Sequence, residues 1–317
     1  MKLTVKLGGC AVTAAALAAC GGGSDSAPEA KQYSQHEVKN VASLGVLVSG
    51  VVSNRAGFAL GLFGGTLVRY STVASGSVPM VQETCGLANG KTGTLSRTIT
   101  KSAFRTGLAA GDQISTTYAN CDVGYGTVLN GMVVLTVQEP AVNMTLNDYD
   151  SHFQASMSSF SMKAAVGDAS ILFGSIAGTA KMVGANRFSG GFTVPNAHVF
   201  GISSGALVLS IGSGATYART DVTYPDAATY VLNGDVTVAA NGTNLPLRIA
   251  TPNTLSGTIV NGYLAPRTGT ITVKDLSRNI ATSTSVNGVS ASVSGDTDGN
   301  GSMDLQFSST WAGLMSM

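Results

Sequence analysis

Residues 127–133 read Thr-Val-Leu-Asn-Gly-Met-Val, and residues 230–236 read Tyr-Val-Leu-Asn-Gly-Asp-Val. In both stretches an Asn-Gly pair interrupts a run rich in Val and Leu. Asn and Gly tolerate the positive φ angles of a type I′ turn, so Asn-Gly between such runs is a strong signal for a β-hairpin. The two stretches therefore predict antiparallel β structure. They are either copies of a duplicated unit of about 100 residues or one hairpin motif used twice.

The same pattern continues along the chain from Val78. Asn-Gly also occurs at 89–90, 241–242, 261–262, 287–288 and 300–301. Short runs rich in Val, Thr, Ser and Leu lie at 92–100, 113–118, 128–138, 153–162, 207–211, 217–224, 230–239, 258–263 and 269–273. Short strands joined by tight turns are typical of antiparallel all-β folds. We expect a β-rich domain over residues 76–317, built on an antiparallel sheet that forms a sandwich, a barrel-like sheet or a long folded sheet.

The Gly/Ala/Val-rich segment 36–75, which precedes the strands, has a helical period instead. Apolar side chains recur at positions 41, 44, 48, 51 and 52, the spacing of one helix face. Ser34 followed by Glu37 resembles a capping box, in which each side chain serves the other's backbone N–H. The pattern predicts a short helix over 36–53. Its continuation fits a helix or a strand, because glycines at 57, 61, 64 and 65 weaken both.

The N-terminus has the features of an export signal. Lys2 and Lys6 precede an apolar run that is shorter than the about 20 residues needed to cross a bilayer. The run ends in Leu-Ala-Ala-Cys at 17–20, which resembles the lipobox of bacterial lipoproteins. The resemblance implies that residues 1–19 are removed and that Cys20 is diacylated on its thiol and becomes the first residue of the mature chain.

The resemblance also implies where the protein is held. Several acyl chains anchor a protein firmly where one binds marginally, because each buried methylene contributes about 0.8 kcal/mol. Gly21 follows Cys20, whereas in this family an Asp at that position favours retention in the inner membrane. Residues 20–35 are rich in Gly, Ser, Ala and Pro and predict a flexible tether. We expect a lipid-anchored protein of the outer membrane that faces the periplasm or the cell surface.

The charge balance of the chain argues against nucleic acid as a partner. Loss of residues 1–19 leaves 16 basic and 17 acidic side chains, so the mature chain has no net positive field for nucleic acid. Charged residues make up only 11% of the sequence, against roughly 25% in ordinary soluble domains. The membrane is then contacted through the anchor alone, and a partner is either a protein or an apolar ligand.

Two cysteines remain once Cys10 leaves with the signal and Cys20 is acylated. Cys85 and Cys121 are then an isolated pair in an exported protein, which predicts one disulfide. The rival interpretation, a catalytic or metal-binding thiol, needs a nearby His or second Cys, and the neighbouring sequence offers none.

Residues 296–304, Asp-Thr-Asp-Gly-Asn-Gly-Ser-Met-Asp, are the best candidate for a metal site. They resemble the DxDxDG calcium loops of EF-hands and dockerins, with Asp296, Asp298, Asn300 and Asp304 as the oxygen ligands. The sequence departs from that pattern at position twelve, where Phe307 replaces the bidentate acid. The alternative is a polar hairpin tip in which Asp and Asn cap their own turn.

No catalytic constellation accompanies this loop. Gly201-Ile202-Ser203-Ser204-Gly205 matches G-x-S-x-G, but a Val/Leu run follows it where a nucleophile elbow needs a helix, and no His lies downstream of His198. His152 neighbours Asp148 and Asp150, and we interpret that trio as a solvated turn. We therefore expect a protein that is not an enzyme and needs no cofactor, with Ca²⁺ as the one candidate ion.

Two functional hypotheses follow from these observations. The first is a non-catalytic envelope or surface interaction module that binds a partner through broad Ser/Thr-rich sheet faces. The second is a carrier whose curved sheet encloses a cavity for a lipid or another apolar ligand, lined or plugged by the segment 41–68. A carrier requires an enclosed apolar void, and an interaction module requires a filled core.

Overall fold

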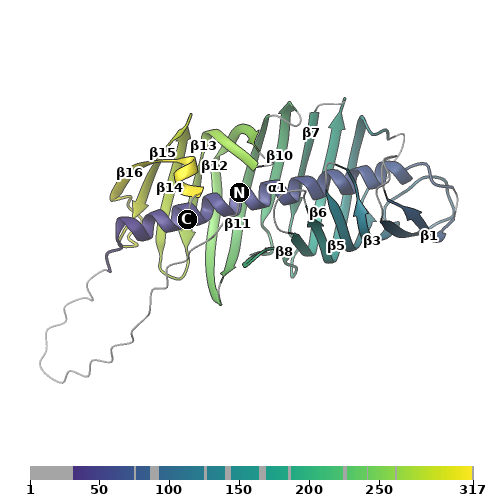
Figure 1. Cartoon of the computed structure of the whole chain (residues 1–317), viewed down its shortest axis with the longest axis horizontal. Helices are drawn as coiled ribbons and strands as arrows, with labels where there is room; N and C mark the ends of the chain where they lie inside the picture. Colours follow the sequence, from purple (N-terminus) through teal and green to yellow (C-terminus); the bar gives the residue numbers. More distant parts are fainter. Residues whose placement is uncertain are drawn as a thin grey trace, which may run out of the picture.

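The computed structural model describes residues 31–315 apart from 75, 86–92, 125–126, 140–143, 164–168, 185–186, 224–226, 241 and 261–262. Within these residues the strands form a single antiparallel sheet of 16 strands, and one long helix lies across it (Figure 1). The all-β fold with an N-terminal helix is confirmed, in the form of a long folded sheet. The elements are α1 (Gln35–Tyr70), β1 (Val78–Thr84), β2 (Thr94–Thr100), β3 (Gln113–Asp122), β4 (Val128–Val137), β5 (Asp148–Lys163), β6 (Ser170–Val183), β7 (Arg187–Thr193), β8 (Phe200–Ser204), β9 (Leu207–Ile211), β10 (Thr216–Thr223), β11 (Ala227–Ala240), β12 (Thr243–Val260), β13 (Tyr263–Asp275), β14 (Ile280–Asn287), β15 (Ser290–Asp296), β16 (Leu305–Thr310) and α2 (Trp311–Met315).

The sheet is a meander with one insertion. Strands β1 to β7 pair in chain order, β10 to β16 do the same, and β7 pairs directly with β10. The hairpin β8–β9 joins the same sheet, because β8 pairs with β6 and β9 pairs with β11. The long strands β6 and β11 are thus bridged by β7–β10 over one half and by β8–β9 over the other. Antiparallel neighbours need only short connections, which the predicted turns supply.

Helix α1 runs perpendicular to the strands and spans nearly the whole sheet (Figure 1). Near its start Val38 packs against Gly295 of β15, and near its end Arg69 pairs with Glu83 of β1. Its 36 residues give a length of about 54 Å. The strands of the main pairing path, at about 4.8 Å each, span about 60 Å. The helix is therefore long because the sheet that it covers is wide.

Small residues at every third or fourth position bring α1 close to the sheet. One helical turn rises about 5.4 Å, close to the spacing of neighbouring strands, so successive turns meet successive strands. The contacts are Gly45 with Val273 of β13, Ser49 with Tyr230 of β11, Ser53 with Tyr217 and Gly57 with Arg219 of β10, and Gly64 with Tyr149 of β5 and Ala180 of β6. A Cβ on Gly45 would lie 2.1 Å from a methyl carbon of Val273, so this contact requires glycine.

The helix begins as predicted and ends later than predicted. Ser34 and Glu37 form the expected capping box, in which the Glu37 N–H donates to the Ser34 hydroxyl and the Ser34 N–H donates to the Glu37 carboxylate. The predicted range 36–53 is too short, because α1 continues to Tyr70. Gly57 and Gly64, two of the glycines that weakened the prediction, pack against side chains of the sheet, and this tertiary contact overrides their low helix propensity.

Two of the predicted hairpins are wrong. Asn130-Gly131 lies inside β4 and Asn233-Gly234 lies inside β11, where the pairing register shifts as at a β-bulge. Gly131 and Gly234 have φ angles of 92° and 139°, and a Cβ on Gly131 would lie 2.2 Å from the Ser159 carbonyl oxygen. The positive φ expected of a type I′ turn is present at the two glycines but not at Asn130 or Asn233, and it bends a strand here without reversing the chain.

Other Asn-Gly pairs do lie at strand ends. Asn287 ends β14 and Gly288, at a φ of 66°, begins the two-residue β14–β15 turn, and 300–301 lies in the β15–β16 connection. Gly242 follows β11 at a φ of 80°, whereas Asn241, 89–90 and 261–262 lie outside the described residues.

The core lies between α1 and the face of the sheet that it covers. Aromatic rings fill this space and contact one another, as in Phe63 of α1 with Phe153 of β5, and in the pairs Phe192–Phe200 and Phe192–Tyr217 of the sheet. By length and composition α1 could cross a membrane, and 67% of its most apolar window is buried inside the protein. Helix α2 follows β16 and packs against α1, with Leu314 fully buried.

Candidate interaction surface

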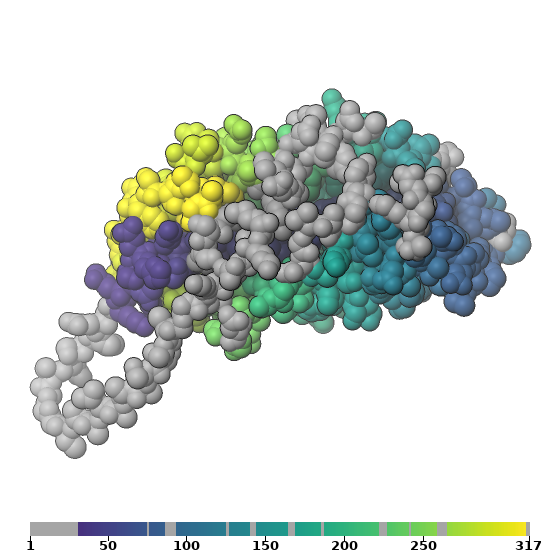
Figure 2. All heavy atoms as spheres, viewed as in Figure 1, coloured from purple at the N-terminus to yellow at the C-terminus, as the bar shows by residue number. Residues whose placement is uncertain are grey.

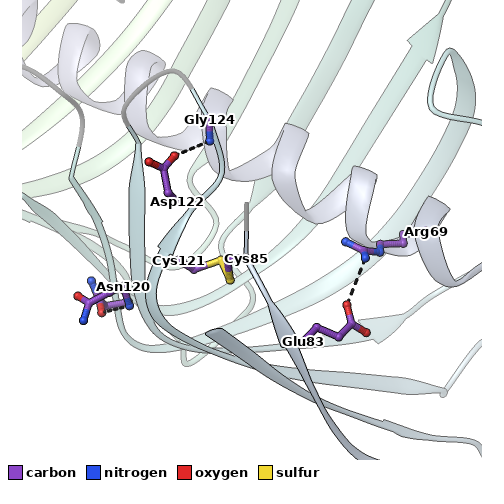
Figure 3. Close-up of a disulfide and its surroundings, with 8 residues drawn as sticks. Arg69, Glu83, Cys85, Asn120, Cys121, Asp122 and Gly124 are labelled. Carbon is purple, nitrogen blue, oxygen red and sulfur yellow. Dashed lines mark hydrogen bonds and ion pairs between the residues drawn. A yellow bond between two sulfur atoms is a disulfide. The ribbon is translucent and has the colours of Figure 1, made fainter. Parts of the chain in front are cut away.

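The disulfide predicted between Cys85 and Cys121 is present. Cys85 directly follows β1, Cys121 lies in β3, and the two sulfurs are 2.04 Å apart (Figure 3). Both side chains are buried. The same view shows Arg69 of α1 reaching Glu83 of β1, an ion pair of 3.2 Å. The disulfide and the ion pair together tie the first strand to its neighbours and to the helix. Cys20, the predicted lipidation site, lies outside the described residues.

The loop at 296–304 is organised by its own side chains. Asp296 is buried, and its two carboxylate oxygens accept from the backbone N–H groups of Asp298, Gly299 and Gly301. Asp304 accepts from the backbone N–H and the hydroxyl of Thr297. The Asp298 carboxylate accepts from the backbone N–H and the side-chain amide of Asn300, and the Asn300 side-chain oxygen accepts from the Ser302 N–H.

These bonds are those of a capped polar turn. They occupy carboxylate oxygens that a cation would also need, so a bound Ca²⁺ would have to compete with backbone amides for Asp296. The described residues contain no group of three or more His, Cys, Asp or Glu side chains placed to hold a metal ion. Calcium binding by Asp296, Asp298, Asn300 and Asp304 stays a prediction.

The other two sequence motifs fall on strands. The Gly201–Gly205 motif lies in β8 and the turn that leads into β9, so strand follows strand as expected. His152 lies inside β5 and not in a turn, which corrects the interpretation from the sequence. Its ring lies 3.3 Å from Glu139 and 3.3 Å from Asp150.

A buried polar network fixes the helix over the centre of the sheet. The Tyr217 hydroxyl donates to the Ser53 carbonyl of α1 at 3.2 Å, and Arg219 donates to Asp221 at 2.6 Å. Burial raises the pKa of Tyr217 to about 12. Burial also raises the pKa of Asp221, and the hydrogen bond and charge of Arg219 offset only part of that effect. Groups this enclosed hold the helix in place and are poorly placed to meet a solute.

The face of the sheet turned away from α1 is a second, exposed surface. In β13, Ile271, Val273 and Asp275 are buried on the helix side, so the alternate positions point outward. Over the three rows nearest the Asn287–Ser290 turn, the outward positions of β13–β16 carry only hydroxyl and amide side chains, whereas the next outward row holds Lys274, Ala281 and Asp296. They form three rows across the strands: Thr272, Ser283, Ser294 and Gln306; Thr270, Ser285, Ser292 and Ser308; and Thr268, Asn287, Ser290 and Thr310. We call this set the hydroxyl lattice.

The hydroxyl lattice is regular and uncharged. Its side chains repeat about 4.8 Å apart between strands and about 6.8 Å apart along each strand. None of the twelve positions is buried. The cross-strand pair Thr270–Ser285 is hydrogen-bonded at 3.2 Å, as is Ser292 with Gln306 at 3.3 Å. The Ser/Thr content predicted polar sheet faces, but the rows become visible only once the strand register is known.

Two shallow hollows lie on the same outward face. One of about 260 Å³ lies over β6, β7, β10 and β11, and is lined by small side chains such as Ala177, Gly191 and Ala218. The other, of about 190 Å³, lies beside the hydroxyl lattice between Arg248, Thr272 and Met303. Neither lies between α1 and the sheet, where a carrier would hold its ligand.

The N-terminal end of the described chain meets the molecule beside the lattice. The Tyr33 N–H donates to the Thr297 carbonyl at 2.7 Å, and its hydroxyl donates to the Arg278 carbonyl at 2.8 Å. Figure 2 shows the start of α1 beside the C-terminal strands, at one end of an elongated body. The residues that follow the predicted tether are therefore fixed near β14–β16.

No protein-family model, no curated protein and no solved structure matches this chain. What the molecule does must therefore be inferred from its own surfaces.

Proposed function

We propose that the protein is a non-catalytic lipoprotein of the outer membrane, anchored through Cys20, that binds a partner through the hydroxyl lattice. The observation that carries the proposal is the lattice itself: twelve uncharged polar side chains, none of them buried, in register on four strands. An uncharged polar surface of this kind repels neither cationic nor anionic partners and offers a regular array of hydrogen-bond donors and acceptors.

The filled interior favours this proposal over a carrier. Helix α1 occupies the face where an apolar ligand would lie, with Gly45 and Gly64 in direct contact with sheet side chains. A carrier would have to displace a 36-residue helix that is hydrogen-bonded to the sheet through Tyr217. An interaction module uses the molecule as it stands.

The lattice is tested by site-specific photo-crosslinking in cells that express the full chain. A photoreactive side chain at Ser292, in the middle row, is expected to give a discrete crosslinked product. Lysine at two neighbouring positions, Ser283→Lys with Ser285→Lys, should remove that product, because bulk and charge break the lattice. The control places the photoreactive group at Val289, which is 80% exposed at a hairpin tip outside the lattice. Equal labelling from both sites, or none from Ser292, contradicts the proposal.

The carrier is tested separately by native mass spectrometry of the mature chain carrying Cys20→Ser, purified from the periplasm. We expect the bare mass of the polypeptide. A retained mass of several hundred daltons that is released on denaturation would favour the carrier instead. The anchor is tested in the same strain, since Cys20→Ser should move the chain from the membrane pellet to the soluble fraction.

A further inference from the structure

The sheet has two edges, and the first is protected. Strand β1 pairs only with β2 on the main path, and it carries Pro79, which has no N–H to offer a further strand. Its pairing with β2 is irregular between Val78 and Val81. It also carries the charge of Glu83, which is paired with Arg69 and Arg97. Proline, charge and irregular pairing are the usual devices that stop an edge strand from recruiting another chain.

The opposite edge, β16, carries none of these devices. Its sequence, Leu-Gln-Phe-Ser-Ser-Thr at 305–310, has no charge and no proline, and its pairing with β15 is regular throughout. Within the part of the chain that the structure describes, no strand pairs with its outer side. An uncharged edge strand with regular pairing is a template for one more strand.

The apolar face of β16 is also left incomplete. Leu305 and Phe307 point toward the core and pack against it, but both are only partly buried. In the strands further in, the same face is closed, as with Val293 of β15 at 0% exposure. One additional strand beside β16 would cover the exposed sides of Leu305 and Phe307, just as β16 covers the side of Val293 in β15.

We propose that this additional strand is β16 of a second copy of the protein, paired antiparallel about a two-fold axis at Phe307. A two-fold axis perpendicular to the sheet keeps inward residues opposite inward residues. The two Phe307 side chains then face each other, Leu305 faces Ser309, and Gln306 faces Ser308. Every pair is uncharged, and the apolar side chains lie together on the core side.

The membrane explains why the partner is a second copy. A strand of six residues is about 20 Å long, so the contact is small and weak between molecules free in solution. The proposed lipid anchor confines copies to one surface and raises their effective concentration. The chain enters the fold at Tyr33, which is bonded to Thr297 in the connection leading to β16, so the anchored ends lie near the paired edges. This step rests on the anchor of the proposed function, but not on any partner of the lattice.

A cysteine scan of the full-length chain in isolated membranes tests both the contact and its register. The described cysteines are already joined to each other, so one introduced cysteine at 306, 307, 308 or 309 supplies the reactive thiol. Mild oxidation should give a disulfide-linked dimer most strongly for Phe307→Cys, because only the residue on the axis faces itself. A maximum at Ser308→Cys would show self-pairing in a different register and overturn the axis. Val289→Cys, exposed at a hairpin tip, measures chance collisions.

Charge variants keep the proposal testable if Phe307→Cys folds poorly. Gln306→Lys with Ser308→Lys sets like charges against each other twice across the axis, whereas Gln306→Glu with Ser308→Lys sets opposite charges against each other. Both positions are exposed, so both variants should fold. The first should reduce dimers, measured by chemical crosslinking in membranes, to the level of collisions, and the second should retain them. Equal dimer levels in the two variants, or a scan no higher than Val289→Cys at any position, overturns the proposal. Fractionation of the same samples shows separately whether the anchor is present.

Discussion

Asn130 and Asn233, at two strand bends, each accept a hydrogen bond from a backbone N–H of the neighbouring strand, but one of these N–H groups is exposed and the other is buried. At each bend the ladder loses a hydrogen bond, and the asparagine side chain replaces it. Asn130 accepts from the Asn120 N–H at 2.7 Å, and Asn233 accepts from the Thr251 N–H at 3.0 Å. Asn120 is exposed, so water can take the place of the Asn130 side chain. Thr251 is buried, so water cannot take the place of the Asn233 side chain.

We therefore expect Asn233→Ala to cost about 1–3 kcal/mol of unfolding free energy, the penalty of a buried N–H without a partner. Asn130→Ala should cost within about 0.5 kcal/mol, because the exposed N–H of Asn120 turns to solvent. Urea denaturation of the two variants measures the difference. Equal costs would mean that the side chains do not serve these amides.

Asp275 should make the stability of the protein depend on pH. It lies at the β13–β14 turn, where the Arg278 carbonyl accepts a hydrogen bond from Tyr33. Burial alone would raise its pKa, but hydrogen bonds from Ser277 and Arg278 outweigh burial and hold the pKa below 3.8. A carboxyl group with a lowered pKa in the folded state stabilises the protein above its unfolded pKa. That contribution is lost as the pH falls through the folded value.

Asp275→Asn should accordingly destabilise the protein at pH 6, by about 1–3 kcal/mol, because its amide N–H₂ would face the donor of Arg278. The difference from the natural chain should shrink as the pH falls through the lowered pKa of Asp275, where the aspartate becomes protonated as well. Thermal unfolding by circular dichroism from pH 2 to 7 measures this. A difference that is constant over the range would contradict the assignment, and Asp148→Asn, at an exposed position, is the control.

At the scale of elements, the fold depends on a match between helix pitch and strand spacing. Because one turn of α1 meets about one strand, the residue that faces the sheet in each turn must leave room for that strand's side chain. Gly45 is such a residue, with Val273 directly against it, whereas Gly65 has no other atom within 4 Å of the position of a Cβ. The two glycines share a helix and differ only in what they face.

Gly45→Ala should destabilise the protein by about 1–3 kcal/mol, since the stiff, branched Val273 cannot yield without moving the strand. Gly65→Ala should instead stabilise it by about 0.5–1 kcal/mol through better helix propensity. Chemical denaturation of this matched pair gives opposite signs if the packing is as described. Two stabilising substitutions would mean that α1 lies further from the sheet.

At the scale of the whole molecule, one helix spans a single sheet, so the ends of the sheet share a core only through α1. Long-range connections therefore matter most at the β1 end, where Arg69, Glu83 and the disulfide Cys85–Cys121 lie together (Figure 3). The disulfide closes a loop of 36 residues, which reduces the freedom of the unfolded chain.

Replacement of both cysteines, Cys85→Ser with Cys121→Ser, should lower the unfolding free energy by about 3–4 kcal/mol. Reductant should lower the stability of the natural chain to the same level and leave the variant unchanged. Denaturation with and without reductant measures both effects. A variant as stable as the natural chain would show that the unfolded state is already constrained without the bond.

The sequence by itself determined the class of the fold and most of its local structure. Alternating Val, Thr and Ser predicted strands, Ser34 with Glu37 predicted the start of the helix, and two leftover cysteines predicted the disulfide. These are local or compositional signals, and each is read from residues a few positions apart or from the count of one residue type. The lipid anchor at Cys20 and the calcium loop at 296–304 stay predictions.

Only the tertiary structure decided the rest. Gly131 has a positive φ that a tight turn would also use, and whether the strand reverses or bends there depends on which distant strand pairs with it. Glycines such as Gly45 and Gly64 weaken an isolated helix, and their contact with the sheet compensates for this in the folded protein. Likewise, alternation places Thr270 and Ile271 on opposite faces but does not say which face α1 will cover. The hydroxyl lattice is exposed because α1 covers the opposite face of the sheet. The edge at β16 is open because β16 is the last strand in the pairing order. Both depend on non-local contacts that no short stretch of sequence encodes.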